Sequence, residues 1–478
     1  VTITAPTTAE LRRQRDLVPE ADLIELRLDH VSDPDVAAAL AGRTRPVILT
    51  CRASWEGGRF QGSEPERKSL LRQALELGAE YVDIEWRAGF DDLVREFGPR
   101  VVLSSHDFSG MGADLPGQAR AMAASGAGVV KIAVTPARLS DCVMLLDLSR
   151  SFAPDQAFVL IAMGDAGLPT RILAQRFGSA WTYAGAVRDV GQISAHRLLE
   201  QFRFRSIGPS TAVYGLTGFP IGHSVSPAMH NAAFRAAGLD AVYLPLPAAD
   251  VDDFLAFARA FGVQGASVTI PHKVALFGKV DETDQLSRTV GALNTLKAAG
   301  AGWAARNTDV AGFLQPLRER TLVLRGMRVS VLGAGGSARA VAVGLAAEGA
   351  IVTIHARDAA KAAAVAQVAG AHVGTLPPAA GSWDLLVNCT PVGMHPKVEA
   401  SPVPAGALGH GLVYDLIYNP ATTQLMREAA AAGCDTIGGL DMLVGQAQHQ
   451  FEWWTGVQPP SGVMRAAADA QLAEFNAS

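Results

Sequence analysis

Short apolar runs alternate with helical patterns through the first 200 or so residues, and this alternation most limits the possible folds. Regular alternation of strands and helices is typical of a parallel sheet. Eight such units in this length predict a closed (βα)8 barrel, with an open doubly wound sheet as the alternative. The eight runs are residues 1–4, 22–28, 46–51, 81–86, 100–104, 129–134, 158–163 and 181–187.

A second alternation follows an interruption at residues 206–210, where Gly208 and Pro209 break the pattern. Residues 328–357 have the pattern of a strand, a glycine turn, a long helix and a strand, and residues from 442 onward have a helical pattern. We therefore predict an α/β protein with three parts. These are a barrel over residues 1–206, a substrate domain over 211–315 completed by helices from about 445–478, and a Rossmann-type nucleotide-binding domain over 316–444.

Composition narrows the class of function. The net charge of −5 over 478 residues gives no electrostatic case for a nucleic acid or membrane partner. The four cysteines are far apart and lack the spacing of metal ligands, so we expect a reducing compartment and no metal. No segment has the roughly 20 uninterrupted apolar residues of a membrane helix. We expect a cytoplasmic enzyme acting on small molecules, with its oligomeric state left open.

Charged side chains gather at the ends of the predicted barrel strands, where active sites of such barrels lie. Lys131 stands inside the apolar run Val-Val-Lys-Ile-Ala-Val. A lone lysine in a strand is most often a snorkelling or edge residue. Here, desolvation and the cations Arg52 and Arg171 are expected to lower the pKa of Lys131 and leave a nucleophilic amine. His106 has the intrinsic pKa of a general acid and base.

These motifs resemble the type I 3-dehydroquinate dehydratases over about residues 1–200. The matching pieces are Glu25-Leu-Arg27-Leu-Asp29, Arg52 with Glu56-Gly-Gly, Ser105-His106-Asp107-Phe108, Lys131-Ile-Ala-Val and Gly191-Gln192. The resemblance implies that Lys131 forms a Schiff base, that His106 is the general acid and base, and that Glu56 orients it. Arg171 would bind the substrate carboxylate, and a further set would bind hydroxyls or hold the site: Glu25, Arg27, Arg52 and Gln192.

The chain departs from that family just before Gln192. The family usually has a short loop containing a serine there, which closes over the substrate. Here the run Val187-Arg-Asp-Val-Gly-Gln192 is shorter and lacks the serine, which puts the lid contacts in question.

A glycine motif follows an apolar strand in the second half and opens a helix, which is the context of a dinucleotide fingerprint. Its residues are Gly333, Ala334, Gly335, Gly336, Ser337 and Ala338. The next strand ends at Arg357, with Lys361 one helical turn further on. These cations suit the 2′-phosphate of NADP, although Asp358 stands beside them.

Further polar residues precede that motif. Ser224 and Ser226 come just before a helix, which suits a carboxylate site although plain N-capping is the simpler interpretation. Lys273 and Asp309 can shuttle the proton that accompanies hydride transfer. Either charge alone is most often a surface residue.

Together these pieces resemble the shikimate dehydrogenases over about residues 211–478, with Met442-Leu-Val-Gly-Gln446-Ala as the last motif. The resemblance implies that Lys273 and Asp309 form the catalytic pair. It also implies a set of substrate contacts: Ser224, Ser226, Thr269, Asn294, Tyr418 and Gln446. The family commonly has an asparagine where this chain has Ser267, and Asn-Arg-Thr where this chain has Ala356-Arg357-Asp358. The first departure bears on substrate positioning, and the second leaves room for mixed use of the two cofactors.

We therefore hypothesise a bifunctional enzyme of the shikimate pathway. Its barrel would dehydrate 3-dehydroquinate to 3-dehydroshikimate, and its second half would reduce that ketone to shikimate with NADPH. One alternative is a shikimate or quinate dehydrogenase whose barrel is inactive and regulatory. The paired serines Ser224 and Ser226 favour shikimate over quinate.

Overall fold

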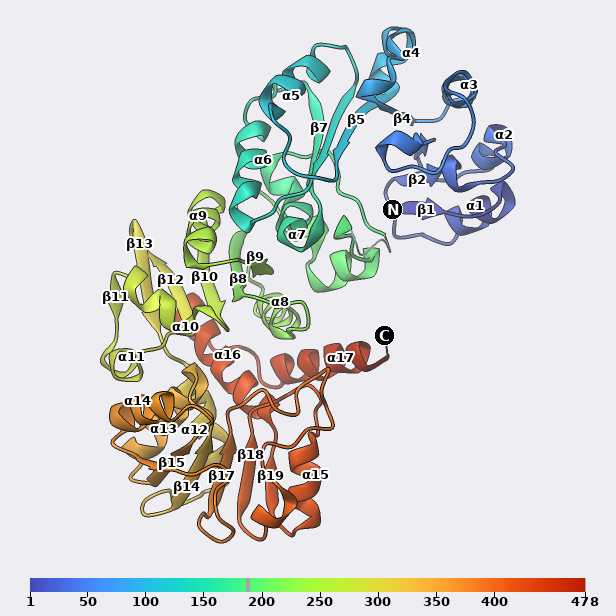
Figure 1. Cartoon of the computed structure of the whole chain (residues 1–478). Helices are drawn as coiled ribbons and strands as arrows, with labels where there is room; N and C mark the ends of the chain where they lie inside the picture. Colours follow the sequence, from blue (N-terminus) through green and yellow to red (C-terminus); the bar gives the residue numbers. More distant parts are fainter. Residues whose placement is uncertain (186–189, 478) are drawn as a thin grey trace. The chain divides into compact units, whose positions relative to one another are not determined.

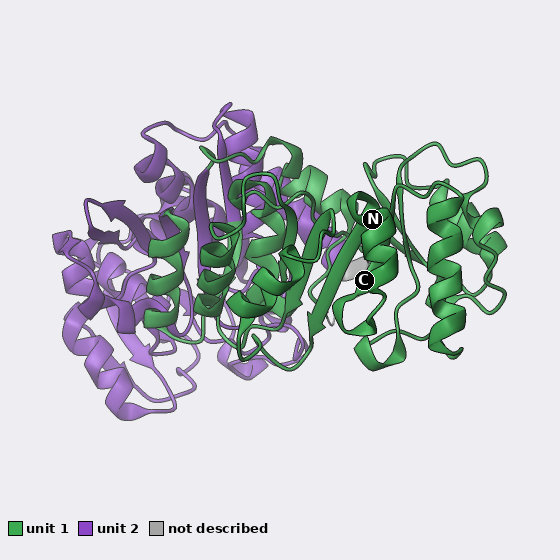
Figure 2. Ribbon diagram, turned by 90° about the horizontal axis from the view of Figure 1, so that it is seen from above, with its two compact units in different colours: residues 1–211, 244–262 green, residues 212–243, 263–478 purple. Residues whose placement is uncertain are grey.

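The computed structural model describes residues 1–185 and 190–477. The chain divides into two compact units, which Figure 2 shows in two colours. One unit comprises residues 1–211 and 244–262, and the other comprises residues 212–243 and 263–478. The α/β class predicted from the sequence is confirmed.

The first unit contains a parallel sheet in which each strand pairs with the next along the chain, from β1 to β7 (Figure 1). The strands are β1 (Thr2–Thr4), β2 (Ile24–Arg27), β3 (Val47–Thr50), β4 (Tyr81–Glu85), β5 (Val101–Asp107), β6 (Val129–Val134) and β7 (Ala157–Ala162). The intervening helices are α1 (Thr8–Arg15), α2 (Val36–Leu40), α3 (Glu64–Glu76), α4 (Asp91–Phe97), α5 (Leu115–Ala123) and α6 (Cys142–Ser149), with α7 (Gly164–Ile172) after β7. This order brings the carboxyl ends of all these strands to one side of the sheet.

The eighth predicted run differs from the others. Its described residues, 181–185, are extended but form no regular strand, and residues 186 and 187 lie outside the described part. The backbone still bridges the two edges of the sheet. Ala180 N donates to Phe158 O at 2.8 Å, and Thr2 N donates to Ala184 O at 3.0 Å. Gly185 N instead bonds Ile193 O, so the chain leaves the ladder there.

A second sheet has the order β11-β13-β12-β10-β8-β9. Its strands are β8 (Ala212–Gly218), β9 (Ala241–Pro247), β10 (Val263–Val268), β11 (Glu282–Thr283), β12 (Thr295–Ala299) and β13 (Gly302–Arg306). The helices among them are α8 (Ser226–Ala236), α9 (Val251–Phe261), α10 (His272–Ala275) and α11 (Gln285–Val290), with α12 (Asp309–Glu319) after β13. The apolar run at residues 292–296 overlaps the start of β12, whereas its hairpin partner β13 has no long apolar run. The hairpin turns at Gly300, whose φ of +58° suits glycine.

The third sheet is parallel, with the order β16-β15-β14-β17-β18-β19. Its strands are β14 (Arg328–Leu332), β15 (Ile351–His355), β16 (His372–Gly374), β17 (Leu385–Asn388), β18 (Leu412–Asp415) and β19 (Asp435–Ile437). The helices are α13 (Gly336–Ala347), α14 (Ala359–Ala369), α15 (Gln424–Ala431), α16 (Gly439–Thr455) and α17 (Val463–Ala477). The strand order reverses at β14, and nucleotides bind at such a switch point.

The last two helices pack against elements that lie far earlier in the chain. Phe451, Trp454 and Met464 share one buried cluster with Tyr214 of β8 and Phe234 of α8. Among the described residues, no helix is long and apolar enough to cross a membrane.

Helices α12 and α16 approach closely through two glycines. A Cβ built on Gly312 would lie 2.5 Å from Gln446 N and 2.8 Å from Met442 O. A Cβ on Gly445 would lie 3.2 Å from the Gly312 Cα. The crossing therefore requires small residues, and it brings Gln446 beside the start of α12.

We expect Gly312→Ala to lower the free energy of unfolding by about 1–3 kcal/mol, because the added methyl overpacks this crossing. Denaturant or thermal unfolding of the full chain measures the change. Gly406→Ala is the matched control, since a Cβ at Gly406 meets nothing within 4 Å. Its effect should stay within about 0.5 kcal/mol. Equal effects of the two substitutions would contradict the close crossing.

Candidate active sites

Lys131 lies in β6 among acidic side chains from other strands. It is only 4% exposed. Its Nζ donates to Asp83 Oδ2 of β4 at 2.9 Å, and Glu25 Oε1 of β2 lies 3.8 Å away. The ring of Tyr183 lies beneath the ammonium, with the Nζ 4.3 Å from the ring centroid. Three other segments of the barrel thus contribute groups around one buried amine.

The expected depression of the Lys131 pKa is wrong for this site without substrate. Burial lowers the pKa of Lys131, but the Asp83 carboxylate, the Tyr183 side chain and Glu25 together raise it above its ordinary value. Arg52 acts in the predicted direction but is outweighed. Arg171 is not among the groups that act on Lys131. The structure therefore holds Lys131 as an ammonium ion.

His106 and Glu56 form a pair at the end of β5. Glu56 Oε1 lies 2.9 Å from His106 Nδ1 and also accepts the His106 backbone N–H at 3.0 Å. Burial raises the pKa of Glu56 to about 7, with Arg52 opposing the rise. Burial, Arg52 and Lys131 hold the pKa of His106 well below its ordinary value. His106 is therefore neutral near pH 7 and able to accept a proton.

Arg171 is a buried cation in α7 that forms no ion pair with an acid in residues 1–185 or 190–477. It is 3% exposed, and its terminal nitrogen donates to Val190 O at 2.6 Å. Among the described residues, its Nε has no hydrogen-bond partner. Burial lowers the pKa of Arg171 to about 10. A buried guanidinium without a carboxylate partner is suited to an anionic ligand.

The remaining predicted barrel residues are placed as follows. Arg27 is paired with Asp29, at 2.9 and 2.8 Å. Arg52 binds Asp83 at 2.8 Å and Glu85 at 3.1 Å. The side chain of Gln192 lies over Gly185, because a Cβ built there would collide with its amide. Residues 187–189 of the predicted lid run lie outside the described residues.

The sequence analysis gave no role to Asp83, which is the nearest acid to Lys131. Asp83 is fully buried, and its pKa is below the ordinary value. Burial alone would raise that pKa, and Arg52 and Lys131 overcome the effect. The signal was present in the sequence, because Asp83 and Glu85 both occur in a strand whose other residues are apolar or aromatic, but strand order was needed to place Asp83 beside the lysine.

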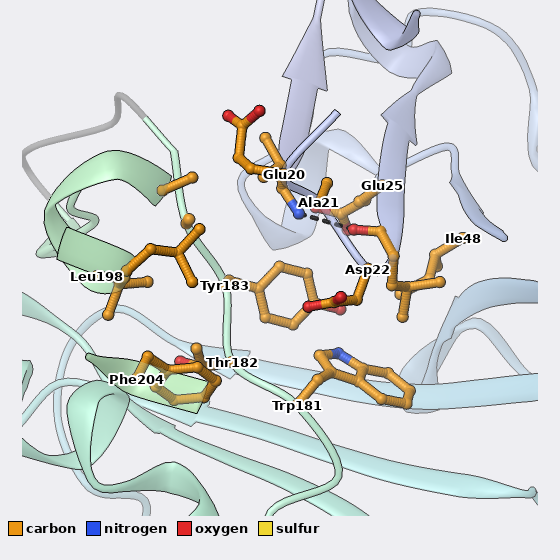
Figure 3. A pocket seen from close by; sticks show the side chains of 15 residues that line it. Glu20, Ala21, Asp22, Glu25, Ile48, Trp181, Thr182, Tyr183, Leu198 and Phe204 are labelled. Carbon is orange, nitrogen blue, oxygen red and sulfur yellow. Dashed lines mark hydrogen bonds between the residues drawn. The ribbon is translucent and has the colours of Figure 1, made fainter. Parts of the chain in front are cut away.

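Glu25 and Tyr183 also line a cavity of about 100 Å³. Figure 3 shows the Tyr183 ring between Trp181, Asp22 and Leu198. Thr182 Oγ1, in the same segment, is buried and has no protein partner among the described residues. The volume is enough for a few water molecules. Water therefore has room beside two of the groups that surround Lys131.

In the second half, Lys273 and Asp309 meet as predicted from their motifs. Lys273 Nζ donates to Asp309 Oδ2 at 2.5 Å. Asn294 Nδ2 donates to the other carboxylate oxygen at 2.7 Å and to Gln446 Oε1 at 3.3 Å. The N–H of Thr308 donates to Asn294 Oδ1 at 2.7 Å, which fixes the direction of the amide. The fold thus joins residues from four separate motifs.

The predicted carboxylate-binding hydroxyls lie near one another. Ser226 N donates to Ser224 Oγ at 3.2 Å. Burial raises the pKa of Tyr418, and a hydrogen bond with Ser224 opposes the rise. Thr269 packs against Gly218, where a Cβ would collide with its methyl.

Ser267, the departure noted in the sequence, is buried in a hydrogen-bond chain that sequence reasoning missed. Tyr243 Oη donates to Ser267 Oγ at 2.6 Å, and Ser267 Oγ donates to Gln450 Oε1 at 2.6 Å. Gln450 Nε2 then donates to Thr295 Oγ1 at 3.0 Å. The Ser267 hydroxyl is thus occupied by protein partners.

The glycine turn after β14 fits a dinucleotide. Gly333 has a φ of +109°, and a Cβ there would lie 3.3 Å from the Cys389 backbone. Gly336 begins α13 and lies against Lys273, whose Cδ would be 3.4 Å from a Cβ built on it. The helix N-terminus that receives a pyrophosphate is therefore adjacent to the Lys273–Asp309 pair.

The predicted 2′-phosphate residues follow the end of β15. Arg357 is exposed. The Asp358 carboxylate caps α14 by accepting the Lys361 N–H at 3.1 Å. The other Asp358 carboxylate oxygen lies 3.7 Å from Lys361 Nζ. Among the described residues, no cluster of His, Cys, Asp and Glu is arranged to hold a metal ion.

Comparisons with known proteins agree with this geometry. The type I 3-dehydroquinase family model matches residues 1–209. The shikimate dehydrogenase substrate-binding domain matches residues 216–296, and the shikimate 5′-dehydrogenase C-terminal domain matches residues 439–468.

Among solved structures, a shikimate dehydrogenase of Thermus thermophilus in complex with NADP(H) and shikimate has a TM-score of 0.51 at 34% identity. The alignment covers 54% of this chain and 99% of that one. A shikimate dehydrogenase (NADP(+)) of Symbiobacterium thermophilum is 41% identical over 56% of this chain and 97% of its own length.

A relative from Arabidopsis thaliana spans both halves. It is described as a chloroplastic bifunctional 3-dehydroquinate dehydratase/shikimate dehydrogenase. It is 34% identical to this chain, and the match covers 92% of this chain and 78% of the relative. The chain belongs to the family of bifunctional 3-dehydroquinate dehydratase/shikimate dehydrogenases.

Proposed function

We propose that Lys131 and His106 dehydrate 3-dehydroquinate and that Lys273 and Asp309 serve the reduction of the product ketone to shikimate. The observation that carries the proposal is the presence of two complete polar constellations in one chain. In one, a buried amine and a neutral His106 share a site. In the other, a Lys–Asp pair adjoins a dinucleotide turn.

In the dehydratase, the Lys131 amine adds to the substrate ketone, and loss of water gives an imine. The imine makes the adjacent C–H acidic, and neutral His106 takes that proton. His106 then returns the proton to the departing hydroxyl, which leaves as water. Hydrolysis of the imine releases 3-dehydroshikimate and restores the amine. The net reaction is loss of one water from 3-dehydroquinate.

The neighbours of this pair have supporting roles in the proposal. Glu56 holds the His106 ring through Nδ1. Arg171 binds the substrate carboxylate, which would satisfy its unpartnered Nε. The remaining predicted residues bind the substrate hydroxyls or hold the other side chains of the site in place: Glu25, Arg27, Arg52 and Gln192. Because Lys131 is held as an ammonium, its proton must leave before attack, and Asp83 at 2.9 Å is the nearest carboxylate.

In the dehydrogenase, NADPH supplies hydride when bound. The Lys273–Asp309 pair holds the proton that the new hydroxyl gains at its oxygen. Asn294 and Gln446 bind ring hydroxyls from the same network that orients Asp309. The carboxylate is bound by the hydroxyl groups of Ser224, Ser226, Thr269 and Tyr418.

The cofactor is held by the turn from Gly333 to Ala338, including Ala334, Gly335, Gly336 and Ser337. Arg357 and Lys361 bind the 2′-phosphate. For the domains, we propose a barrel over residues 1–206, a substrate domain over 211–315 with helices from about 445–478, and a nucleotide domain over 316–444.

Borohydride trapping with dehydroquinate should leave a stable adduct on the peptide that contains Lys131. The adduct should be absent in Lys131→Ala, because no amine remains to form the imine. Lys68→Ala, at a surface ion pair of α3, is the control and should trap normally. If the unmodified chain traps nothing while shikimate oxidation with NADP proceeds, the barrel is inactive. Parallel assays with quinate test the other alternative.

The raised pKa of Glu56 predicts a pH-dependent stability. Its pKa is about 7 in the folded chain, against 4.5 ordinarily. The protonated form is therefore favoured by folding, and that contribution is lost as pH rises from about 4.5 through 7. The melting temperature of Glu56→Gln minus that of the unmodified chain should be larger at about pH 8 than at about pH 5. Glu76→Gln is the control, and an unchanged difference would refute the assignment.

Replacement of Arg357 by Ala should reduce kcat/KM for NADPH by roughly 10- to 100-fold, because a charge-assisted contact with the 2′-phosphate is lost. The value for NADH should change little. Steady-state kinetics with both cofactors measure the ratio. Arg325→Ala, at an exposed arginine before β14, is the control. An equal fold-reduction of kcat/KM for NADH would show that Arg357 does not bind the 2′-phosphate.

A further inference from the structure

A chain of alternating charges runs from Lys131 to the surface of the barrel. Lys131 binds Asp83, and Arg52 binds both Asp83 and Glu85. Arg67 of α3 then binds Glu85 and also Glu64, the latter at 2.6 Å. The members from Lys131 to Arg67 are all at most 4% exposed. Buried charges at such short distances depend on one another, because each one is neutralised only by its neighbours.

Arg67, like Asp83 and Glu85, lies outside the motifs found in the sequence. Its side chain is completely buried, beside the ring of Phe90 at 4.8 Å. Its guanidinium donates to Glu64, Glu85 and the Cys51 carbonyl. A capping box formed by Ser63 and Glu66 starts the helix one turn earlier. Arg67 is therefore fixed in place without touching the reactive amine.

We propose that Arg67 is a positioning residue of the dehydratase, because by neutralising Glu85 it leaves Arg52 on Asp83 and so weakens the hold of Asp83 on the Lys131 ammonium. The inference rests on the proposed Schiff-base role of Lys131. It adds a residue four ion pairs away from the amine, and that residue governs how readily the amine loses its proton.

The strength with which Asp83 binds Lys131 depends on how Arg52 divides between two carboxylates. It lies 2.8 Å from Asp83 and 3.1 Å from Glu85. Without Arg67, Glu85 would be a buried carboxylate with Arg52 as its remaining cation among these contacts, and Arg52 would shift toward it. Asp83 would then bind Lys131 more strongly, and the amine would hold its proton to higher pH. Removal of the Glu85 charge would act in the opposite direction.

Other groups also face Lys131 and must be considered. Glu25 approaches from β2, Tyr183 from the segment after β7, and His106 from β5. Within the described part of the chain, the hydrogen bonds of Arg67 go to none of these three. A change at Arg67 therefore reaches Lys131 through Glu85, Arg52 and Asp83.

The test measures the rate of imine formation against pH in the full chain. Enzyme and dehydroquinate are mixed at about pH 6 to 10, quenched with borohydride and read by mass. In Arg67→Met, the rise of this rate should move to higher pH by about one unit, the size expected for one nearby charge. In Glu85→Gln it should move to lower pH. In the double variant, which keeps the charges balanced, it should return close to the unmodified profile.

Two controls separate positioning from folding. Circular dichroism and thermal unfolding report whether the barrel of each variant is folded, and Arg72→Met, on the same helix but partly exposed, should leave the profile unchanged. Arg67→Lys keeps the charge and should restore most of the profile if Arg67→Met folds poorly. A loss of rate that is equal at every pH, or shifts of the same sign in the two single variants, would overturn the inference. Absence of any adduct in the unmodified chain would instead refute the proposed role of Lys131.

Discussion

The ion pair between Lys131 and Asp83 is the contact on which the barrel site depends. Both groups are buried, and an unpaired charge in that position would cost several kcal/mol. Pairing makes burial possible, but it also holds the lysine as an ammonium, which is the wrong form for attack on a ketone. The surrounding charges of Arg52, Glu85 and Arg67 therefore matter for chemistry as well as for folding, since they decide how strongly Asp83 holds the amine.

The site around Lys273 and Asp309 in the second half is built mainly from neutral groups. Lys273 and Asp309 form the ion pair of this site, and the rest of the site, among the described residues, is a network of amides and hydroxyls. The Thr308 N–H fixes the amide of Asn294, and the amide nitrogen in turn faces Asp309. Gly312 and Gly445 allow α12 and α16 to approach, which places Gln446 in the same network. Backbone geometry thus sets the direction of donors that the proton transfer requires.

Much of the architecture could be predicted from local pattern. The apolar runs matched β2 through β7, and the strand–glycine–helix pattern matched β14 and α13. The hairpin strand β13 was missed because its residues Gly302–Arg306 carry no long apolar run. Residues 181–185 have the composition of a strand but not its regular pairing. The predicted pKa of Lys131 was wrong because the argument counted its cations and not Asp83, whose position beside it depends on strand order.

The sequence by itself determined the two chemical constellations and the turn for a dinucleotide. Those signals are local, since a motif of a few residues specifies a turn, a cap or a strand end. Tertiary structure decided the electrostatic state of the groups. It placed Asp83 beside Lys131, buried Arg171 without an acid partner among the described residues, and used Asp358 to cap α14. Charge interactions depend on distance and burial in space, and neither is encoded in spacing along the chain.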